Sequence, residues 1–396
     1  MDARQVIAAE ARYLVPTYPR PPFVLTRGEG VYLYDSEGRR YTDWVAGIAV
    51  NALGYGDPEI VTTLQEAAAG LIHVSNLYHT APHVALAEAL VQHSFADRVY
   101  FANSGTEAVE AAIKFSRKWA RTHFGPGKTQ IVAFTGSFHG RTMGALALTA
   151  REKYQAPFRP LMPDVVFARF NDLASAEAAI GPRTAAVIVE PVQGEGGIHP
   201  ADDAFLQGLR ELCDRHGAAL IFDEIQCGLG RTGTLWAHEP SGVRPDLMTL
   251  AKPLGGGLPI GATLVTEAIA GAIGPGDHGS TFAAGPLVTA VALRVFQRIA
   301  DPAFLASVRE KGEALVRRLR EAQLPHVVEV RGRGLMLGLE LTVSAKKVVE
   351  RGYEAGLLLV NAGDTVLRLI PPLIIGQEQV DELLEKLPGI LEEASG

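Results

Sequence analysis

Residues 219–228 read ALIFDEIQCG, and this stretch is the best guide to the fold of the chain. Residues 219–222 form a short apolar run that is typical of a buried strand. Asp223 and Glu224 follow it directly, at the carboxyl end of the expected strand. An unpaired charge is costly to bury. The two acids therefore predict a cation at this end of the strand.

Four more apolar runs alternate with stretches of helical periodicity in the middle of the chain, at 131–134, 165–170, 185–190 and 247–251. Strands that are apolar on both sides and separated by helices predict a mostly parallel sheet covered on both faces. In such sheets, ligands bind at the carboxyl ends of the strands. Polar clusters follow most of these runs, which predicts one functional edge.

The two ends of the chain differ from this middle part. Near the N-terminus, GVYLYDSEGRRYTDW predicts a small antiparallel ribbon with a turn at Glu37 and Gly38. Amphipathic helices are predicted over 287–322, followed by short strands and a closing helix over 377–393. This order of elements predicts a smaller α+β unit at the C-terminus.

Composition excludes several classes of protein. Of the 396 residues, 47% are apolar and 20% charged, and the net charge of −7 argues against a nucleic-acid partner or an anionic membrane surface. Cys213 and Cys227 are the only cysteines, so we expect no disulfide framework, no metal site and a reducing compartment. Since no run approaches the ~18 apolar residues of a membrane span, and the N-terminus lacks the apolar core of a secretion signal, we expect a cytoplasmic protein.

The motif NSGTEA combines a helix start with a possible anion site. Ser104 stands where a helix begins, and Glu107 follows three residues later, as in a capping box. A helix cap with no further function explains this spacing equally well. The alternative is a phosphate cup formed by Ser104, Gly105 and Thr106, because free N–H groups and the helix dipole attract an anion.

Two further motifs follow expected strands. In SFHGRT, Phe138 and Arg141 flank His139 and could stack on a planar ring and bind a carboxylate, although such residues are more often core and solvated surface, respectively. In VEPVQGEGG, Glu190 and Glu195 flank a glycine-rich turn, where solvated acids are the simpler interpretation.

Lys252 in LAKPLGGG follows a strand and precedes three glycines. The sequence does not match the phosphate-binding pattern GxxxxGK[ST], so a desolvated lysine that acts as a Schiff-base nucleophile is the better hypothesis. Ser280 and Thr281 offer two more anion donors. Arg368 is the only charge in the apolar run VLRLI, where a buried structural ion pair is the alternative to a binding role.

The ordered set NSGTEA, SFHGRT, VEPVQGEGG, FDEIQCGLGRTG, AKPLGGG, HGSTF and LRLIPP resembles the class III pyridoxal-phosphate aminotransferases, from about residue 27 to the C-terminal helix. The resemblance implies fold type I, the aspartate-aminotransferase-like α/β fold with a mostly parallel central sheet and a smaller α+β domain. It also implies that residues 57–290 form the large cofactor-binding domain. Residues 1–56 and 291–396 would then make up the small domain.

The resemblance implies pyridoxal 5'-phosphate as the cofactor and assigns roles to the motif residues. Lys252 would bind the cofactor and transfer a proton, and Asp223 would face the protonated pyridine nitrogen, the cation that the strand end requires. Besides these two, the implied cofactor-binding residues are Ser104, Gly105, Thr106, Phe138, His139, Glu190, Ile225, Gln226, Ser280 and Thr281. Thr281 would reach the phosphate of a neighbouring subunit, which implies a homodimer with shared active sites.

Substrate roles follow from the same resemblance. Arg141 would bind the amino donor, Arg368 a carboxylate of glutamate or 2-oxoglutarate, and Glu195 would pair with an arginine when the other substrate is bound. The segments AGIAVNALGYGDPE and SNLYHT most resemble acetylornithine aminotransferases, and Ile48 stands where ornithine aminotransferases tend to have tyrosine. We therefore expect transfer of the side-chain amino group of N-acetylornithine to 2-oxoglutarate.

Several alternatives share these motifs. Ornithine, succinylornithine, 4-aminobutyrate or a carrier-linked lysine precursor could be the amino donor of a related enzyme. A pyridoxal-phosphate aminomutase shares the fold and the lysine but needs no outgoing keto acid. A non-catalytic protein that binds a phosphate ligand has no need for Lys252 and Asp223 together.

Overall fold

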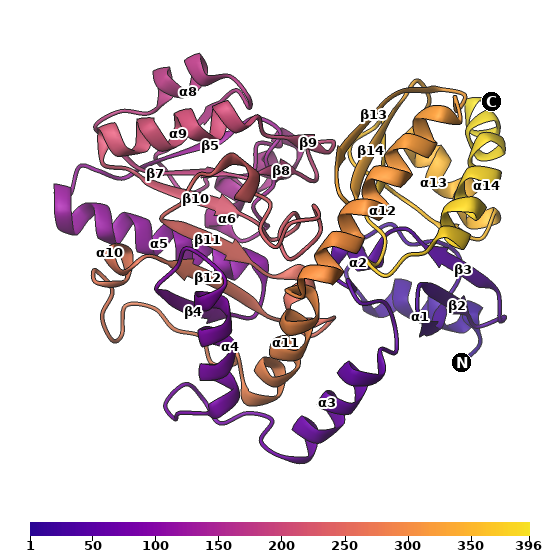
Figure 1. Cartoon of the computed structure of the whole chain (residues 1–396), viewed down its shortest axis with the longest axis horizontal. Coiled ribbons are helices and arrows are strands. Elements are labelled where there is room, and N and C mark those ends of the chain that lie inside the picture. Colours follow the sequence, from indigo (N-terminus) through magenta and orange to yellow (C-terminus); the bar gives the residue numbers. More distant parts are fainter.

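The computed structural model describes residues 1–396, and a seven-stranded sheet forms its centre (Figure 1). The strand order is β4-β12-β11-β10-β7-β5-β6. The strands are β4 (Arg98–Ala102), β5 (Gln130–Phe134), β6 (Val165–Ala168), β7 (Thr184–Val189), β10 (Ala219–Asp223), β11 (Leu247–Leu250) and β12 (Gly261–Val265). Only β12 is antiparallel to its neighbours, so the predicted mostly parallel sheet is confirmed.

Helices cover both faces of this sheet (Figure 1). Along β10, Leu220 and Phe222 pack against α8 (Leu173–Ala179) and α9 (Asp203–His216). Ile221 faces the opposite way, into a cluster with α5 (Gly105–Phe124) and α10 (Glu267–Ala270). Because side chains alternate along a strand, Asp223 emerges on the same side as Ile221, which is the side of α5.

Two smaller sheets lie beside the central one. The first contains β1 (Leu25–Glu29), β2 (Tyr32–Asp35), β3 (Arg40–Asp43) and β15 (Leu357–Leu358). The second contains β13 (Val327–Arg333), β14 (Met336–Leu341), β17 (Val366–Leu369) and β16 (Val360–Asn361), and β8 (Val192–Gln193) pairs with β9 (His199–Pro200) as a short ribbon. The antiparallel pairing of β2 with β3 is the ribbon that the sequence predicts.

The first of these sheets joins the two ends of the chain, since β15 pairs in parallel with β3. The N- and C-termini also lie in the same half of the molecule (Figure 1). These two features support the proposal that residues 1–56 and 291–396 form one small domain beside residues 57–290.

The other helices complete the fold. They are α1 (Ala3–Tyr13), α2 (Ala46–Ala49), α3 (Pro58–Ala69), α4 (Ala81–Gln92), α6 (Met143–Ala147), α7 (Glu152–Gln155), α11 (Pro286–Ile299), α12 (Pro302–Glu321), α13 (Ala345–Glu354) and α14 (Gln377–Ser395), with 3-10 turns at Ala156–Phe158, Glu239–Ser241 and Lys252–Gly255. The amphipathic stretch predicted at 287–322 thus forms two helices, because Asp301 caps a new helix that has Pro302 in its first turn. None of the helices is long and apolar enough to cross a membrane.

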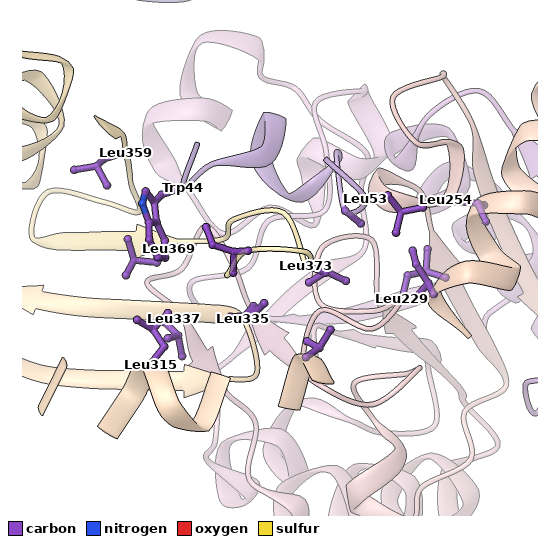
Figure 2. Packing of buried hydrophobic residues seen from close by; sticks show 14 of the residues in the cluster. Trp44, Leu53, Leu229, Leu254, Leu315, Leu335, Leu337, Leu359, Leu369 and Leu373 are labelled. Carbon is purple, nitrogen blue, oxygen red and sulfur yellow. The ribbon is translucent and has the colours of Figure 1, made fainter. Parts of the chain in front are cut away.

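One apolar cluster connects the central sheet with the second small sheet. It contains Met248 and Leu264 from β11 and β12, and Leu337 and Leu369 from β14 and β17. Figure 2 shows its side chains in a continuous row, from Trp44, Leu337 and Leu369 through Leu335 and Leu373 to Leu229 and Leu254. A shared core of this kind holds the loops of the two sheets in a fixed relation.

Close packing also fixes the start of α5. The backbone of Gly261 in β12 lies so near the carbonyl oxygen of Ser104 that a β-carbon at position 261 would collide with it. Ser104 is the N-cap residue of α5, so the contact with β12 fixes the position of the first turn of this helix.

We expect Gly261→Ala to lower the free energy of unfolding by about 1–3 kcal/mol, because the added methyl group must displace backbone rather than a flexible side chain. Chemical denaturation of the variant and of the original chain measures the difference. Gly127→Ala is the matched control, since no atom lies within 4 Å of the β-carbon it would add. Equal stability of the two variants would contradict the close packing at Gly261.

Candidate active site

Eleven of the fifteen residues predicted for the site line one cavity of about 280 Å³ at the carboxyl ends of β5, β7, β10 and β11. They are Gly105, Thr106, Phe138, His139, Arg141, Glu190, Glu195, Asp223, Ile225, Gln226 and Lys252, and Gly140 and Ala251 complete the lining. Three larger cavities, of about 830, 770 and 310 Å³, are lined by other residues. The smaller cavity is the candidate active site because the predicted residues, among them the buried Asp223 and Glu190, come together in it.

Asp223 is buried with only 3% of its surface exposed, and both of its carboxylate oxygens have partners. Oδ2 lies 2.7 Å from Nδ1 of His139, and Oδ1 accepts hydrogen bonds from the backbone N–H of Ile225 at 3.1 Å and the hydroxyl of Thr249 at 3.2 Å. Burial lowers the pKa of His139, but the hydrogen bond and the negative charges of Asp223 and Glu190 outweigh it and raise that pKa. The imidazole is thus the partner of this carboxylate whose protonation the site favours.

Lys252 begins the short 3-10 turn after β11 and reaches the same cavity. Burial lowers the pKa of its amine, and the positive charge of Arg368 adds to that effect. The carboxylates of Glu195 and Asp223 act in the opposite direction without cancelling it. A lysine with a lowered pKa is neutral for a larger fraction of the time, as a nucleophile or a general base requires.

The start of α5 forms one wall of the cavity. Gly105 and Thr106 are the first residues of the helix, so their N–H groups have no partner one turn earlier. Gly105 packs closely here, because a β-carbon would lie 2.9 Å from Cδ1 of Ile225 and would displace that side chain. An anion bound at this wall would meet free N–H donors and the positive end of the helix dipole.

Three of the predicted anion donors lie outside the cavity lining. Ser104 caps α5, accepting from the backbone N–H of Glu107 at 3.3 Å and donating to its carboxylate at 3.0 Å, as a helix cap does. Ser280 accepts from the side-chain amide of Asn103 at 2.8 Å. Thr281 is exposed, and its role in the site of a second subunit stays a prediction.

Arg368 and Glu195 form an ion pair at the edge of the cavity. Nη1 of Arg368 lies 2.6 Å from Oε1 of Glu195 and 3.0 Å from Oε1 of Gln226. Burial raises the pKa of Glu195, but the charges of Arg368 and Lys252 outweigh that effect and lower it. Arg368 is 1% exposed and its Nε has no hydrogen-bond partner, so a single carboxylate leaves part of this buried guanidinium unsatisfied.

Two residues of the site were missed by the sequence reasoning. Tyr154 lies under the guanidinium of Arg141, with 3.8 Å between that group and the ring centroid. Arg151 donates a hydrogen bond to the backbone oxygen of Glu195 and thereby fixes the loop that carries this acid. Their segment, TAREKYQ, carries no pattern of its own, and only its position 11 to 14 residues after Gly140 could have drawn attention to it.

Glu224 and Cys227 have structural positions. The carboxylate of Glu224 accepts from the backbone N–H groups of Ala237 and His238 and from Nδ1 of His238, at 2.6–2.9 Å, so it closes the loop after β10. The thiol of Cys227 is 1% exposed and donates to the backbone oxygen of Asp223 at 3.6 Å. Its burial indicates a packing role rather than an accessible thiol.

Glu190 connects two of the loops that form the site. Its carboxylate accepts from the backbone N–H groups of Phe138 at 3.0 Å and Gly194 at 3.2 Å. Burial raises its pKa from 4.5 to about 7, with the positive charge of His139 acting against the rise. The folded chain therefore binds a proton at Glu190 more tightly than the unfolded chain does. The stabilisation of the fold by protonated Glu190 is complete below about pH 4.5 and is lost as the pH rises through about 7.

We expect Glu190→Gln to remove this pH dependence. In the apoprotein, the variant should gain stability relative to the original chain between about pH 5 and about pH 8, by at most about 3 kcal/mol. Denaturant unfolding of both proteins at the two pH values measures the change. A stability difference that is the same at both values would show that Glu190 ionises normally.

Comparisons with known proteins agree with this geometry. The sequence model of the family Aminotransferase class-III matches residues 13–391. The mitochondrial acetylornithine aminotransferase of Alnus glutinosa is 53% identical, over 98% of this chain and 88% of its own. The acetylornithine aminotransferase of Methanocaldococcus jannaschii is 44% identical, over 99% of both chains.

Solved structures show the same fold. The N-acetylornithine aminotransferase from Stenotrophomonas maltophilia is 41% identical with a TM-score of 0.85, covering 98% of each chain. The ornithine aminotransferase from Toxoplasma gondii ME49 is 29% identical with a TM-score of 0.95, covering 100% of this chain and 96% of the other. These likenesses confirm the predicted α/β fold of the aminotransferase type.

The residues of the cavity also fit the cofactor of such enzymes. Free N–H groups at the start of α5 suit a phosphate, the buried carboxylate of Asp223 suits a cationic ring nitrogen, and Lys252 has the lowered pKa of a nucleophilic amine. The predicted cofactor, pyridoxal 5'-phosphate, is the one that this family uses. Because the family model spans residues 13–391 and the relatives are similar over nearly their whole length, the chain belongs to the class III aminotransferases.

Proposed function

We propose that the protein transfers the side-chain amino group of N-acetylornithine to 2-oxoglutarate, giving N-acetylglutamate semialdehyde and glutamate. The observation that carries the proposal is the ion pair of Arg368 with Glu195, at the edge of the cavity that Glu195 and Lys252 line. An arginine with a movable internal carboxylate suits an enzyme whose single site must accept two different substrates in turn. Relatives named acetylornithine aminotransferase support the choice of amino donor.

In this proposal, the cofactor-binding roles follow from the cavity wall. The N–H groups of Gly105 and Thr106 would hold the phosphate, and Phe138 and Ile225 would flank the ring. Asp223 would hold the positive charge on the ring nitrogen, with His139 orienting the carboxylate. When bound, pyridoxal 5'-phosphate carries the amino group between the two substrates and accepts electrons into its ring.

Lys252 would act as the base that takes a proton from the substrate carbon and returns it. A base is most effective when its pKa lies near the working pH, and burial shifts the pKa of Lys252 in that direction. Since Glu195 opposes the shift, displacement of Glu195 towards another partner would lower the pKa of Lys252 further.

Arg368 would bind a substrate carboxylate only after Glu195 releases it. With the pair formed, the buried positive charge is neutralised and the cavity suits the acylated donor. When glutamate or 2-oxoglutarate enters, its carboxylate would replace that of Glu195. Bidentate binding would then use more of the guanidinium than the pair with Glu195 does.

We also propose a homodimer with shared active sites. Exposed apolar side chains gather on two segments, with Leu71, Ile72, Leu77 and Tyr78 on one and Phe282 on the other, and all are at least 60% exposed. Asn76 holds the segments together by donating to the backbone oxygens of Ser280 and Ala283. A large exposed apolar patch is typical of an interaction surface. This patch adjoins Thr281, the residue expected to reach a second subunit.

Single-turnover spectroscopy of the holoenzyme tests the substrates. We expect N-acetylornithine and glutamate, added separately, to change the absorption band of the bound cofactor at least about tenfold faster than ornithine or 4-aminobutyrate do, as the relatives named acetylornithine aminotransferase suggest. Ile48 lines the separate cavity of about 830 Å³ and not the candidate active site, so the expectation does not rest on it. The apoprotein is the control. Faster conversion with ornithine or 4-aminobutyrate would contradict the proposed donor, although not the aminotransferase chemistry.

Separate half-reactions test the carboxylate exchange. We expect Arg368→Ala to reduce kcat/KM for glutamate on the order of 100-fold, and for N-acetylornithine by clearly less, because only glutamate would use this guanidinium directly. Glu195→Gln removes the competing carboxylate, so it should reduce kcat/KM for glutamate less than kcat/KM for N-acetylornithine. Equal losses in both half-reactions for both variants would show that the ion pair is only structural.

A further inference from the structure

A second charged cavity lies away from the active site. This arginine groove has a volume of about 770 Å³ and is formed by α12, the turn between β13 and β14, and residues 232–240 of the loop after β10. Four arginines line it: Arg309, Arg317 and Arg320 on α12, and Arg333 at the end of β13. It shares no lining residue with the active-site cavity, so the proposed transaminase chemistry leaves it without a role.

None of these four arginines forms an ion pair. Two acids, Glu313 and Glu321, also line the arginine groove, but no carboxylate oxygen comes within 4.0 Å of the four guanidinium groups. Neighbouring arginines behave differently: Arg318 pairs with Asp381 at 2.6 Å, and Arg331 pairs with two glutamates. The lining therefore carries an excess of two positive charges in a chain whose net charge is −7.

Backbone carbonyl groups hold three of the arginines in place. Arg320 donates to the oxygen of Val330 at 2.9 Å, and Arg333 donates to the oxygen of Ala237 at 2.9 Å. Arg309 makes a longer contact of 3.5 Å with the oxygen of Gly233. A guanidinium has five N–H donors, so each keeps most of its donors for a ligand. Arginines fixed in this way lose less side-chain entropy when an anion binds.

The backbone segments that form the arginine groove pack closely against one another. A β-carbon on Gly312 of α12 would collide with the backbone of Gly334, and one on Gly334 would collide with the backbone of Thr232. The helix, the turn and the loop therefore meet with no room for side chains at these points. The hydroxyls of Thr232 and Thr234, 3.5 Å apart, lie on the same lining.

We propose that the arginine groove binds a small polyanion that carries two or more phosphate groups. Several guanidinium groups without carboxylate partners are stabilised by an anion, and their planar N–H pairs match the oxygens of a phosphate. The cavity volume lies in the range of small-molecule sites. This inference does not depend on the proposed transaminase substrates.

Calorimetric titration of the holoenzyme at about physiological ionic strength tests the proposal, with inorganic phosphate, pyrophosphate, tripolyphosphate and citrate as probes. The holoenzyme is used so that the bound cofactor keeps the probes from the expected phosphate site at the start of α5. We expect one saturable site that binds tripolyphosphate more tightly than inorganic phosphate, with an affinity that falls as salt is added. Citrate that binds as tightly as tripolyphosphate would overturn the assignment to phosphates.

Charge variants locate the binding site. We expect Arg317→Gln and Arg333→Gln each to weaken tripolyphosphate binding by about tenfold, since each removes a charge-assisted hydrogen bond. Glu313→Gln should strengthen binding, because it removes an acid from the lining. Arg317 makes no hydrogen bond within the chain, so its replacement leaves the fold intact.

Arg121→Gln is the matched control, because Arg121 is an exposed arginine on α5 outside the arginine groove, and we expect it to leave tripolyphosphate binding unchanged. The absence of saturable binding for all four probes would overturn the proposal. Equal effects of Arg121→Gln and Arg317→Gln would do so too, since they would show only a response to net charge.

Discussion

The buried carboxylate of Asp223 is the constraint on which the arrangement of the site depends. Alternation along β10 turns this side chain towards α5, while Leu220 and Phe222 anchor the strand on the other face. A buried charge must be satisfied, and three segments supply the donors: His139 after β5, Thr249 in β11 and the backbone of Ile225. Loops that are far apart in the sequence are therefore drawn to one point.

A second set of buried charges connects this point with the small sheets. Arg368 stands in β17 and reaches Glu195 and Gln226 on loops of the central sheet. Arg231, which is fully buried, donates to the backbone oxygens of Leu335, just before β14, and of Pro371, just after β17, the strand that carries Arg368. Burial lowers the pKa of Arg231 to about 9, with Asp43 acting against the shift. The position of Arg368 thus depends on polar contacts as well as on the apolar core.

Much of this arrangement was predictable from the sequence, because local patterns carry it. The apolar run before Asp223, the helix start at Ser104 and the lysine before three glycines each have a signature of their own. The pairing of His139 with Asp223 spans 84 residues and has no such signature. Tyr154 and Arg151 are likewise placed by tertiary packing alone, since a short helix brings them back over residues 138–141 and 195. Local patterns identify the groups at each strand end but not which of them meet.

The parallel pairing of β15 with β3 has a consequence for the order in which the chain is built. Leu357 and Leu358 lie opposite Thr42 and Asp43, so more than three hundred residues separate the two partners in the sequence. During synthesis from the N-terminus, β3 has an unpaired edge until almost the entire polypeptide has left the ribosome. An unpaired edge is a template for wrong partners. The edge of β3 in a nascent chain therefore stays open to wrong partners until β15 has emerged.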